Sequence, residues 1–141
     1  MLEENKAVVD GITKAFNEGK FDLLDKLVAA DFVGHTPFSP EDMKGREALK
    51  GFFAATHAAF SDLRHPGWTL IAEGDLVSIH MALEGTFTNE FMGIPPNGKK
   101  VVVWMHNLWR IADGKAVEWW FYADTLGFMQ QLGAIPPMGE A

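Results

Sequence analysis

Hydrophobic residues recur every three to four positions in the first third of the chain and predict helices. Val8, Ile12 and Phe16 share one helical face, and Gly19 supplies a stop. A second, short amphipathic segment ends near residues 30–31; its apolar residues are Phe21, Leu24, Leu27 and Val28. A third helix is expected over residues 46–60. Its apolar stripe consists of Leu49, Phe52, Phe53, Thr56 and Phe60.

From Leu63 onward, β-branched and aromatic residues alternate with polar ones, which is typical of strands. The predicted strands cover residues 63–72, 76–88, 100–111 and 116–123. Residues 73–75 and 112–115 have the composition of tight hairpin turns. Residues 89–99, which contain two prolines and two glycines, form a loop. A last helix is expected over residues 126–132.

This order, helices first and antiparallel strands afterwards, favours an α+β domain in which a curved sheet packs against separate helices. The length of 141 residues suits one domain, 1–141. A curved sheet leaves a concavity between itself and the helices, and an apolar pocket with a few polar groups is the usual form of a small-molecule site. The side chains expected to line it are Trp104, Met81, Trp120 and Phe53.

Composition and charge exclude several classes of binding partner and cellular location. The net charge is −7 and the twelve Lys and Arg residues form no cluster, so nucleic acid is not an expected partner. No cysteine is present, which suits a cytoplasmic protein. The N-terminal residues are acidic and polar, unlike a signal peptide, and no apolar run is long enough to span a membrane.

The aromatic strand at residues 118–123 is followed by an acid, Asp124. Alternation places Trp120, Tyr122 and Asp124 on one face. A carboxylate held among aromatic rings is desolvated, which raises its pKa and suits it to general acid/base chemistry. Alternatively, Asp124 is the N-cap of the helix that begins at residue 125 or 126. Tyr122 could offer its hydroxyl to a carbonyl, or pack with its hydroxyl at the rim.

Three histidines are candidate binding residues. His106 and His80 lie on neighbouring predicted strands, where an imidazole could hydrogen-bond a substrate carbonyl or a backbone group. His35 lies where the chain re-enters the domain body after the second helix. His57 and His65 are interpreted as structural or solvated. No histidine spacing is typical of a metal site, and none is predicted.

Several local strings resemble the SnoaL-like polyketide cyclase family of the nuclear-transport-factor-2-like superfamily. They cover residues 85–99, residues 110–115, and the pattern Glu118-x-Trp120-x-x-x-Asp124 followed by Gln-Gln-Leu-Gly at 130–133. The resemblance implies a cone-shaped fold of cystatin-like topology. It also implies a cofactor-free acid/base enzyme acting on a polyketide-like or ester ligand, with Asp124 as the catalytic aspartate and His106 as the carbonyl-binding histidine. The resemblance further implies that the segment around His35 can reach the mouth of the pocket.

The sequence therefore predicts a small-molecule cyclase, with two alternatives. An isomerase, dehydratase or hydratase would need a second carboxylate facing Asp124, and Glu84 and Glu90 are the candidates. A non-catalytic ligand-binding or dimerisation module is the other alternative. A homodimer or higher oligomer is expected, formed through the outer face of the sheet. The candidate contact residues are Trp109, Trp119 and Phe121.

Overall fold

The N-terminal third is helical largely as its periodicity predicts. The structure is a computed structural model and describes residues 1–139. The helical elements are α1 (Leu2–Glu18), the 3-10 turn η1 (Phe21–Leu23), α2 (Leu24–Leu27) and α3 (Arg46–Ala59). Gly19 follows α1 in the left-handed conformation, with φ of 69°, and its backbone N–H donates to carbonyls of the last turn. The predicted helix stop is confirmed.

One predicted helix end is wrong. The second helical segment stops at Leu27, and Val28 begins the strand β1 (Val28–His35) instead of completing a helical turn. β1 pairs in parallel with the C-terminal strand, with Val33 opposite Glu118, and in antiparallel with the short strand β2 (Met43–Lys44). A four-residue spacing of apolar side chains fits a helix, but here long-range pairing decides the conformation.

The second half of the chain is a series of strands. They are β3 (Phe60–Arg64), β4 (Trp68–Glu73), β5 (Leu76–Phe87), β6 (Lys100–Ala112) and β7 (Lys115–Ala123), and the helix α4 (Thr125–Leu132) follows. The single strand predicted over residues 63–72 is wrong, because His65-Pro66-Gly67 separates β3 from β4. Both predicted hairpins are confirmed. In the second, Asp113 and Gly114 have φ of 52° and 75°, as a two-residue turn requires.

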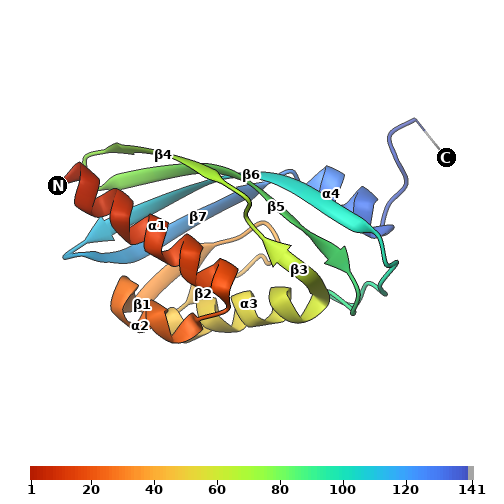
Figure 1. Cartoon of the computed structure of the whole chain (residues 1–141), viewed down its shortest axis with the longest axis horizontal. Coiled ribbons are helices and arrows are strands. Elements are labelled where there is room, and N and C mark those ends of the chain that lie inside the picture. The colour runs from red at the N-terminus through yellow and green to blue at the C-terminus, as the bar shows by residue number, and fades with distance from the viewer. Residues whose placement is uncertain (140–141) are drawn as a thin grey trace.

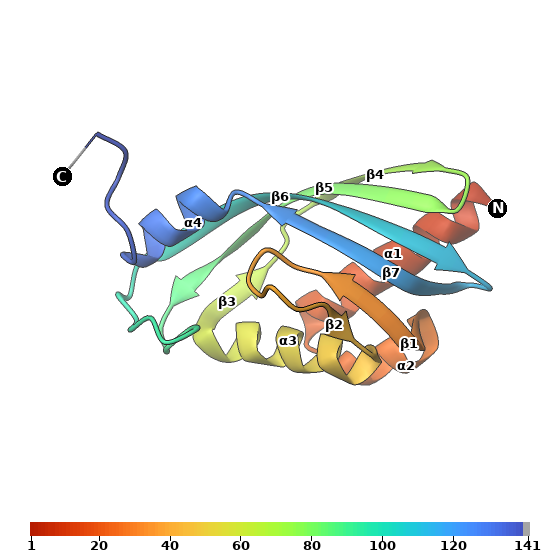
Figure 2. The ribbon, with the colours of Figure 1, turned by 180° about the vertical axis from the view of Figure 1, so that it is seen from behind.

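The strands form one mixed sheet in the order β2-β1-β7-β6-β5-β3, and β4 pairs with β5. Figures 1 and 2 show the long strands arching over α1 and α3, with α4 at the end of the sheet near the C-terminus. The predicted α+β architecture with a strongly curved sheet is confirmed. Its concave face and the helices bury the apolar core, whose fully buried side chains include Trp119, Phe32 and Phe87.

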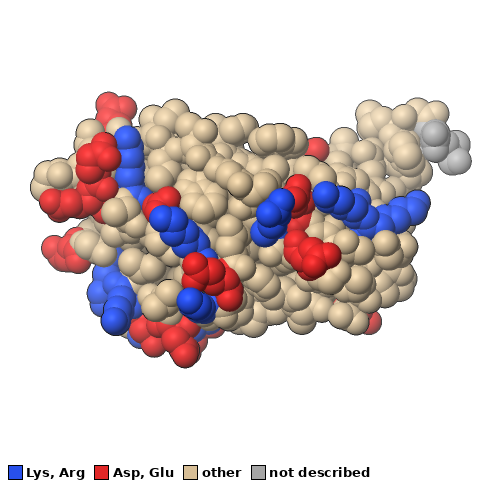
Figure 3. Space-filling model, in the orientation of Figure 1, with Lys and Arg blue, Asp and Glu red and all other residues tan. Residues whose placement is uncertain are grey.

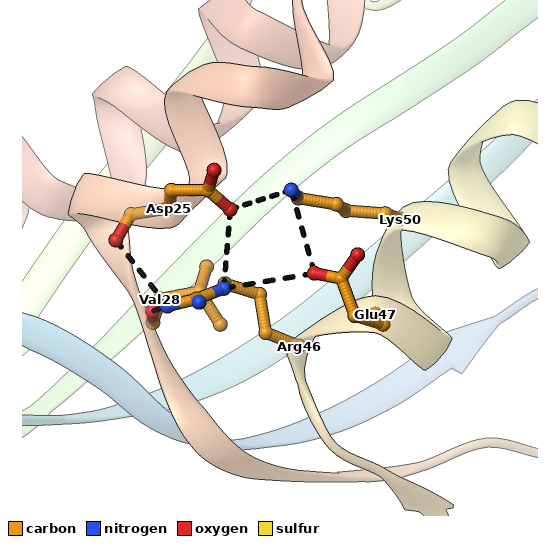
Figure 4. A network of polar contacts seen from close by, with 5 residues as sticks. All are labelled: Asp25, Val28, Arg46, Glu47 and Lys50. Atoms are coloured by element: carbon orange, nitrogen blue, oxygen red, sulfur yellow. Dashed lines mark hydrogen bonds and ion pairs between the residues drawn. The ribbon is translucent and has the colours of Figure 1, made fainter.

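A polar network fixes the start of α3 against the preceding segment (Figure 4). The Arg46 guanidinium donates to the backbone carbonyls of Asp25, at 3.3 Å, and Val28, at 3.1 Å. It thereby satisfies carbonyls at the point where α2 ends and β1 begins. Glu47 and Lys50 complete the network through ion pairs.

Charged side chains of both signs are interspersed on the face of the molecule shown in Figure 3. That face carries no broad patch of one sign, in keeping with the scattered basic residues of the sequence. None of the helices within residues 1–139 has the length and hydropathy needed to cross a bilayer.

Candidate functional site

An internal cavity lies between the concave face of the sheet and the helices. Its volume is about 60 Å³, small beside the roughly 300–1,000 Å³ of typical small-molecule sites. The lining is mainly aromatic and aliphatic. It comprises Ile12, Thr13, Phe16, Phe38, Phe52, Phe53, Thr56, His65, Met81, Leu83, Phe91, Val103, Met105, Asn107, Trp119, Phe121, Ala123 and Phe128.

Asn107 is a polar residue at an inward position of β6. Its side chain is only 2% exposed, and its two neighbours on the same face of the strand, Met105 and Trp109, are apolar and buried. Its Oδ1 accepts a hydrogen bond from the Tyr122 backbone N–H at 3.2 Å. The amide nitrogen meets only the Met105 sulfur, at 3.9 Å, and sulfur is a weak acceptor. Asn107 therefore has donor capacity available for a ligand oxygen.

Two threonine hydroxyls also line the cavity. Thr13 and Thr56 each donate to a backbone carbonyl one helical turn earlier, at 2.9 Å and 2.8 Å. Their hydrogens are occupied, so toward the cavity these hydroxyls can act as acceptors.

Among the described residues, His65 contributes the one imidazole in the lining. It is 7% exposed and lies in the break between β3 and β4. Its Nδ1 lies 3.0 Å from the Ala82 carbonyl oxygen. A carbonyl only accepts, so Nδ1 carries the proton and Nε2 is an acceptor. Burial lowers the pKa of His65 to about 4, which keeps the ring neutral at neutral pH.

The position of His65 is fixed by Asn17 of α1. The Asn17 amide accepts from the His65 backbone N–H at 2.7 Å and donates to the His65 carbonyl at 2.9 Å. The imidazole also packs on the Phe16 ring, with ring centroids 4.9 Å apart. A polar cradle therefore holds a neutral imidazole at the cavity wall.

The residues that the sequence analysis placed around Asp124 lie on the opposite, convex face of the sheet. His80 is opposite His106, and His106 is opposite Tyr122, in the strand register. Together with Trp104 and Asp124 they line a shallow groove of about 300 Å³. Trp104 is 56% exposed and Tyr122 is 62% exposed. The expectation that this face encloses the pocket is wrong, because the convex face is open to solvent.

Asp124 is exposed and forms the N-cap of α4, as the structural alternative predicted. Its Oδ1 accepts a hydrogen bond from the Gly127 backbone N–H at 2.9 Å. The expected desolvation of this carboxylate is therefore contradicted. The preceding residue, Ala123, does line the internal cavity, so Asp124 directly follows a lining residue along the chain.

The remaining predictions for the lining divide in two. Phe53 and Met81 line the cavity, as expected. Trp120 does not: it faces outward and packs against His35. The sequence analysis expected three aromatic residues at an exposed association surface, but they lie on the inner face, so that expectation is wrong. Trp109, Trp119 and Phe121 are all buried. The homodimer itself stays a prediction.

The two acids considered as partners for Asp124 do not face it across the cavity. Glu84 forms an ion pair with Arg64, at 3.1 Å. Glu90 lines a separate groove at the molecular surface. The arrangement of two opposed carboxylates that would favour the isomerase alternative is not formed by these residues.

The groove that contains Glu90 adjoins the cavity. Its volume is about 370 Å³. Phe38, Phe52 and Phe91 line both the groove and the cavity, so these three rings separate the cavity from the surface. Phe91 belongs to the predicted loop at 89–99, which thus supplies part of the wall.

His35 does not line the cavity. It lies next to the surface groove, whose lining includes the following residue, Thr36. Its Nδ1 lies 2.9 Å from Asp42 Oδ1, and its Nε2 lies 2.7 Å from Glu118 Oε2. The hydrogen bond with Glu118, and then that with Asp42, raises the pKa of His35 above its ordinary value. Its ring stacks on Trp120 at a centroid distance of 5.5 Å.

Comparison with known proteins agrees with this architecture. The model of the SnoaL-like polyketide cyclase family matches residues 6–132. The chain belongs to the SnoaL-like polyketide cyclase family.

Named relatives of this SnoaL-like chain are cyclases. Aklanonic acid methyl ester cyclase DnrD of Streptomyces peucetius is 29% identical over 136 residues, which cover 94% of this chain and 93% of the relative. Nogalonic acid methyl ester cyclase of Streptomyces nogalater is 26% identical over 123 residues, covering 86% and 92% of the two chains. At the level of the family, these relatives support a cyclase-type enzyme.

Solved structures of other proteins have the same fold as this chain. The crystal structure of IdmH from Streptomyces antibioticus superposes with a TM-score of 0.79 at 33% identity, covering 92% of this chain and 98% of IdmH. TsrD from Streptomyces laurentii superposes with a TM-score of 0.84 at 25% identity, covering 94% and 97% of the two chains.

The cavity lining includes four polar residues that the sequence analysis did not single out for function: Thr13, Thr56, His65 and Asn107. His65 was interpreted as structural or solvated because it precedes a proline, and nothing local indicates that it faces a cavity. Asn107 could have been found. It interrupts an apolar series at every second position of β6, and a buried amide in such a series needs a partner.

Proposed function

We propose that the chain closes a ring in an ester-bearing polyketide-type substrate by proton transfer, with the internal cavity as its site. Membership of the family supports the reaction class, and the names of the two curated relatives support an ester substrate. The observation that carries the assignment to the cavity is the pair His65 and Asn107, a buried acceptor and a buried donor in an otherwise mainly apolar lining.

Aldol-type ring closure proceeds in three steps. A base removes the proton next to a carbonyl, the resulting enolate carbon attacks a second carbonyl, and the new alkoxide takes up a proton. The enolate oxygen gains from a hydrogen-bond donor, which the Asn107 amide can provide. His65 Nε2 can accept the carbon-bound proton and return a proton to the alkoxide. Its pKa of about 4 makes it a weak base in the free protein, but the enolate that forms beside it supplies a negative charge that favours the protonated ring. The protons balance, and the product is an isomer of the substrate.

Asp124 is the competing proton-transfer group, supported by the motif it ends and by its place beside Ala123. To take part, its carboxylate must leave the Gly127 N–H and turn toward the cavity. His65 lies in the cavity wall without such a movement. His106 would serve only a ligand on the convex face, where it borders the shallow groove.

A polyketide with several fused rings needs more room than about 60 Å³. We propose that entry moves the rings of Phe38, Phe52 and Phe91, which separate the cavity from the surface groove. The ligand then occupies the cavity together with part of the groove, whose combined space approaches that of ordinary small-molecule sites.

The test measures turnover of aklanonic acid methyl ester, the substrate class named for a relative, by His65→Gln, Asp124→Asn and His106→Gln. We expect His65→Gln to lower kcat by about 100-fold or more, with the fold intact by circular dichroism. His106→Gln, on the convex face, should leave turnover unchanged. A loss confined to Asp124→Asn would transfer the proton-transfer role to Asp124. Full activity in both variants would refute acid/base catalysis by either group.

A further inference from the structure

Both ring nitrogens of His35 lie against carboxylates from different parts of the chain. Asp42 belongs to the segment 36–42 between β1 and β2, which we call the mouth loop, and Glu118 belongs to β7. The imidazole has hydrogen-bond partners on both sides, at 2.9 Å and 2.7 Å, and a tryptophan ring beneath it.

This arrangement depends on the charge of the ring. A neutral imidazole has one N–H and can donate to only one of the two carboxylates, whereas the imidazolium donates to both. The two contacts exist together only when His35 is protonated. The neutral ring must turn one nitrogen lone pair toward a carboxylate oxygen, which repels it.

The mouth loop contains Phe38, one of the rings between the groove and the cavity. Its ring lies 5.7 Å from that of Phe121 and 5.9 Å from that of Phe128, both in the cavity wall. The other side-chain bonds recorded for the loop are local: the Phe38 N–H donates to Thr36, and the Glu41 N–H donates to Ser39. Within residues 1–139, the His35–Asp42 contact is therefore the side-chain polar link between the loop and the residues of β1 and β7, next to the backbone pairing of β1 and β2 that begins at Met43.

We propose that protonated His35 is a latch that holds the mouth loop, and with it Phe38, closed over the cavity entrance. His35 is thus a positioning residue that governs access, and it does not touch the substrate. This inference rests on the proposed use of the internal cavity, but it does not depend on which reaction takes place there.

The charges around His35 determine which contact is lost on deprotonation. Arg110 of β6 pairs with Glu118 at 3.6 Å and with Asp75 at 2.8 Å, and it keeps Glu118 in place. Glu118 also makes the shorter and less exposed contact with His35. The neutral ring therefore keeps its bond to Glu118 and releases Asp42.

Two further charged groups lie close to this site along the chain, Glu41 in the mouth loop and Lys44 in β2. No ion pair is recorded for either of them within residues 1–139. The direction of the effect follows from the raised pKa of His35. The latch is closed below about pH 6.5 and is lost as the pH rises through the higher value of the folded protein.

The test follows entry of methyl 2-naphthoate, a neutral bicyclic ester that does not titrate between pH 6 and pH 9, by stopped-flow quenching of tryptophan fluorescence. We expect the association rate to rise about three- to fivefold over this range, since partly exposed ion pairs shift equilibria by less than about tenfold. His35→Gln and Asp42→Asn should both show the fast rate at every pH. Glu41→Gln, a neighbouring acid of the same loop, should behave as the unmodified chain.

Hydrogen–deuterium exchange provides a readout that needs neither ligand nor turnover. After correction for the intrinsic pH dependence of exchange, amides of residues 36–42 should exchange faster in Asp42→Asn than in Glu41→Gln at pH 6, and equally at pH 9. Equal exchange in the two variants at pH 6, or an association rate independent of pH in the unmodified chain, would overturn the latch. A failure of ring closure alone would leave both measurements unchanged.

Discussion

The burial of His65 makes a quantitative prediction about stability and pH. The ring is neutral in the folded protein, with a pKa of about 4 compared with an ordinary value of 6.5. Below pH 6.5 the imidazole is protonated in the unfolded chain but stays neutral in the folded chain. The free energy of unfolding therefore decreases as the pH falls toward 4. His65→Gln removes this titration.

The magnitude follows from the two pKa values. Each unit of pH between them changes the free energy of unfolding by about 1.4 kcal/mol, which gives about 2 kcal/mol at pH 5 and about 3 kcal/mol at pH 4. The assay is urea denaturation at pH 8 and pH 5 for both proteins. Between these pH values, the unmodified chain should lose about 2 kcal/mol more than His65→Gln.

Comparing the variant with the unmodified chain cancels the other titrations. His35, for instance, has a raised pKa and acts in the opposite direction, because it stabilises the fold at low pH. His106→Gln, which replaces an exposed histidine on the convex face, is the matched control for the substitution itself. Equal losses in His65→Gln and the unmodified chain would refute the reasoning and show that the imidazole is hydrated.

Two further predictions concern the helix cap and the glycines. Asp124→Ala should lower the free energy of unfolding by about 1 kcal/mol through loss of the bond to Gly127, and Asp124→Asn should not; urea denaturation of the two variants separates capping from chemistry. Gly51→Ala, at an open site within α3, should stabilise by about 0.5–1 kcal/mol. Gly85→Ala should cost about 1–3 kcal/mol, because its Cβ would lie 3.2 Å from the Ser61 carbonyl oxygen. A cost at Gly51 equal to that at Gly85 would contradict the packing argument.

Periodicity located most elements because it depends on local geometry. The stripe of Val8, Ile12 and Phe16 is a helical face, and the alternation in β6 and β7 is that of strands. β1 was not predicted from the sequence, because Val28 follows Leu24 and Leu27 at a spacing that is typical of a helix. Only pairing with β7, far along the chain, makes it a strand.

The candidate site was harder to predict, because alternation sorts residues into two faces without saying which one is concave. In β7 both faces carry large rings: Trp119 and Phe121 inside, Trp120 and Tyr122 outside. The motif at Asp124 indicated the right family, but the rings around it pointed to the wrong side of the sheet. The side was decided by the helices that cover the opposite face, which is a property of tertiary packing.

The parallel pairing of β1 with β7 has a consequence for how the chain acquires its structure. Residue 33 meets residue 118, so the N-terminal strand cannot complete its share of the sheet until residues 116–120 have emerged from the ribosome. Contacts so distant in sequence slow folding, since a large loop must close before they form. During synthesis, the edge of β1 that later pairs with β7 therefore stays unpaired, and a chaperone that shields this edge would be expected to raise the yield of native protein.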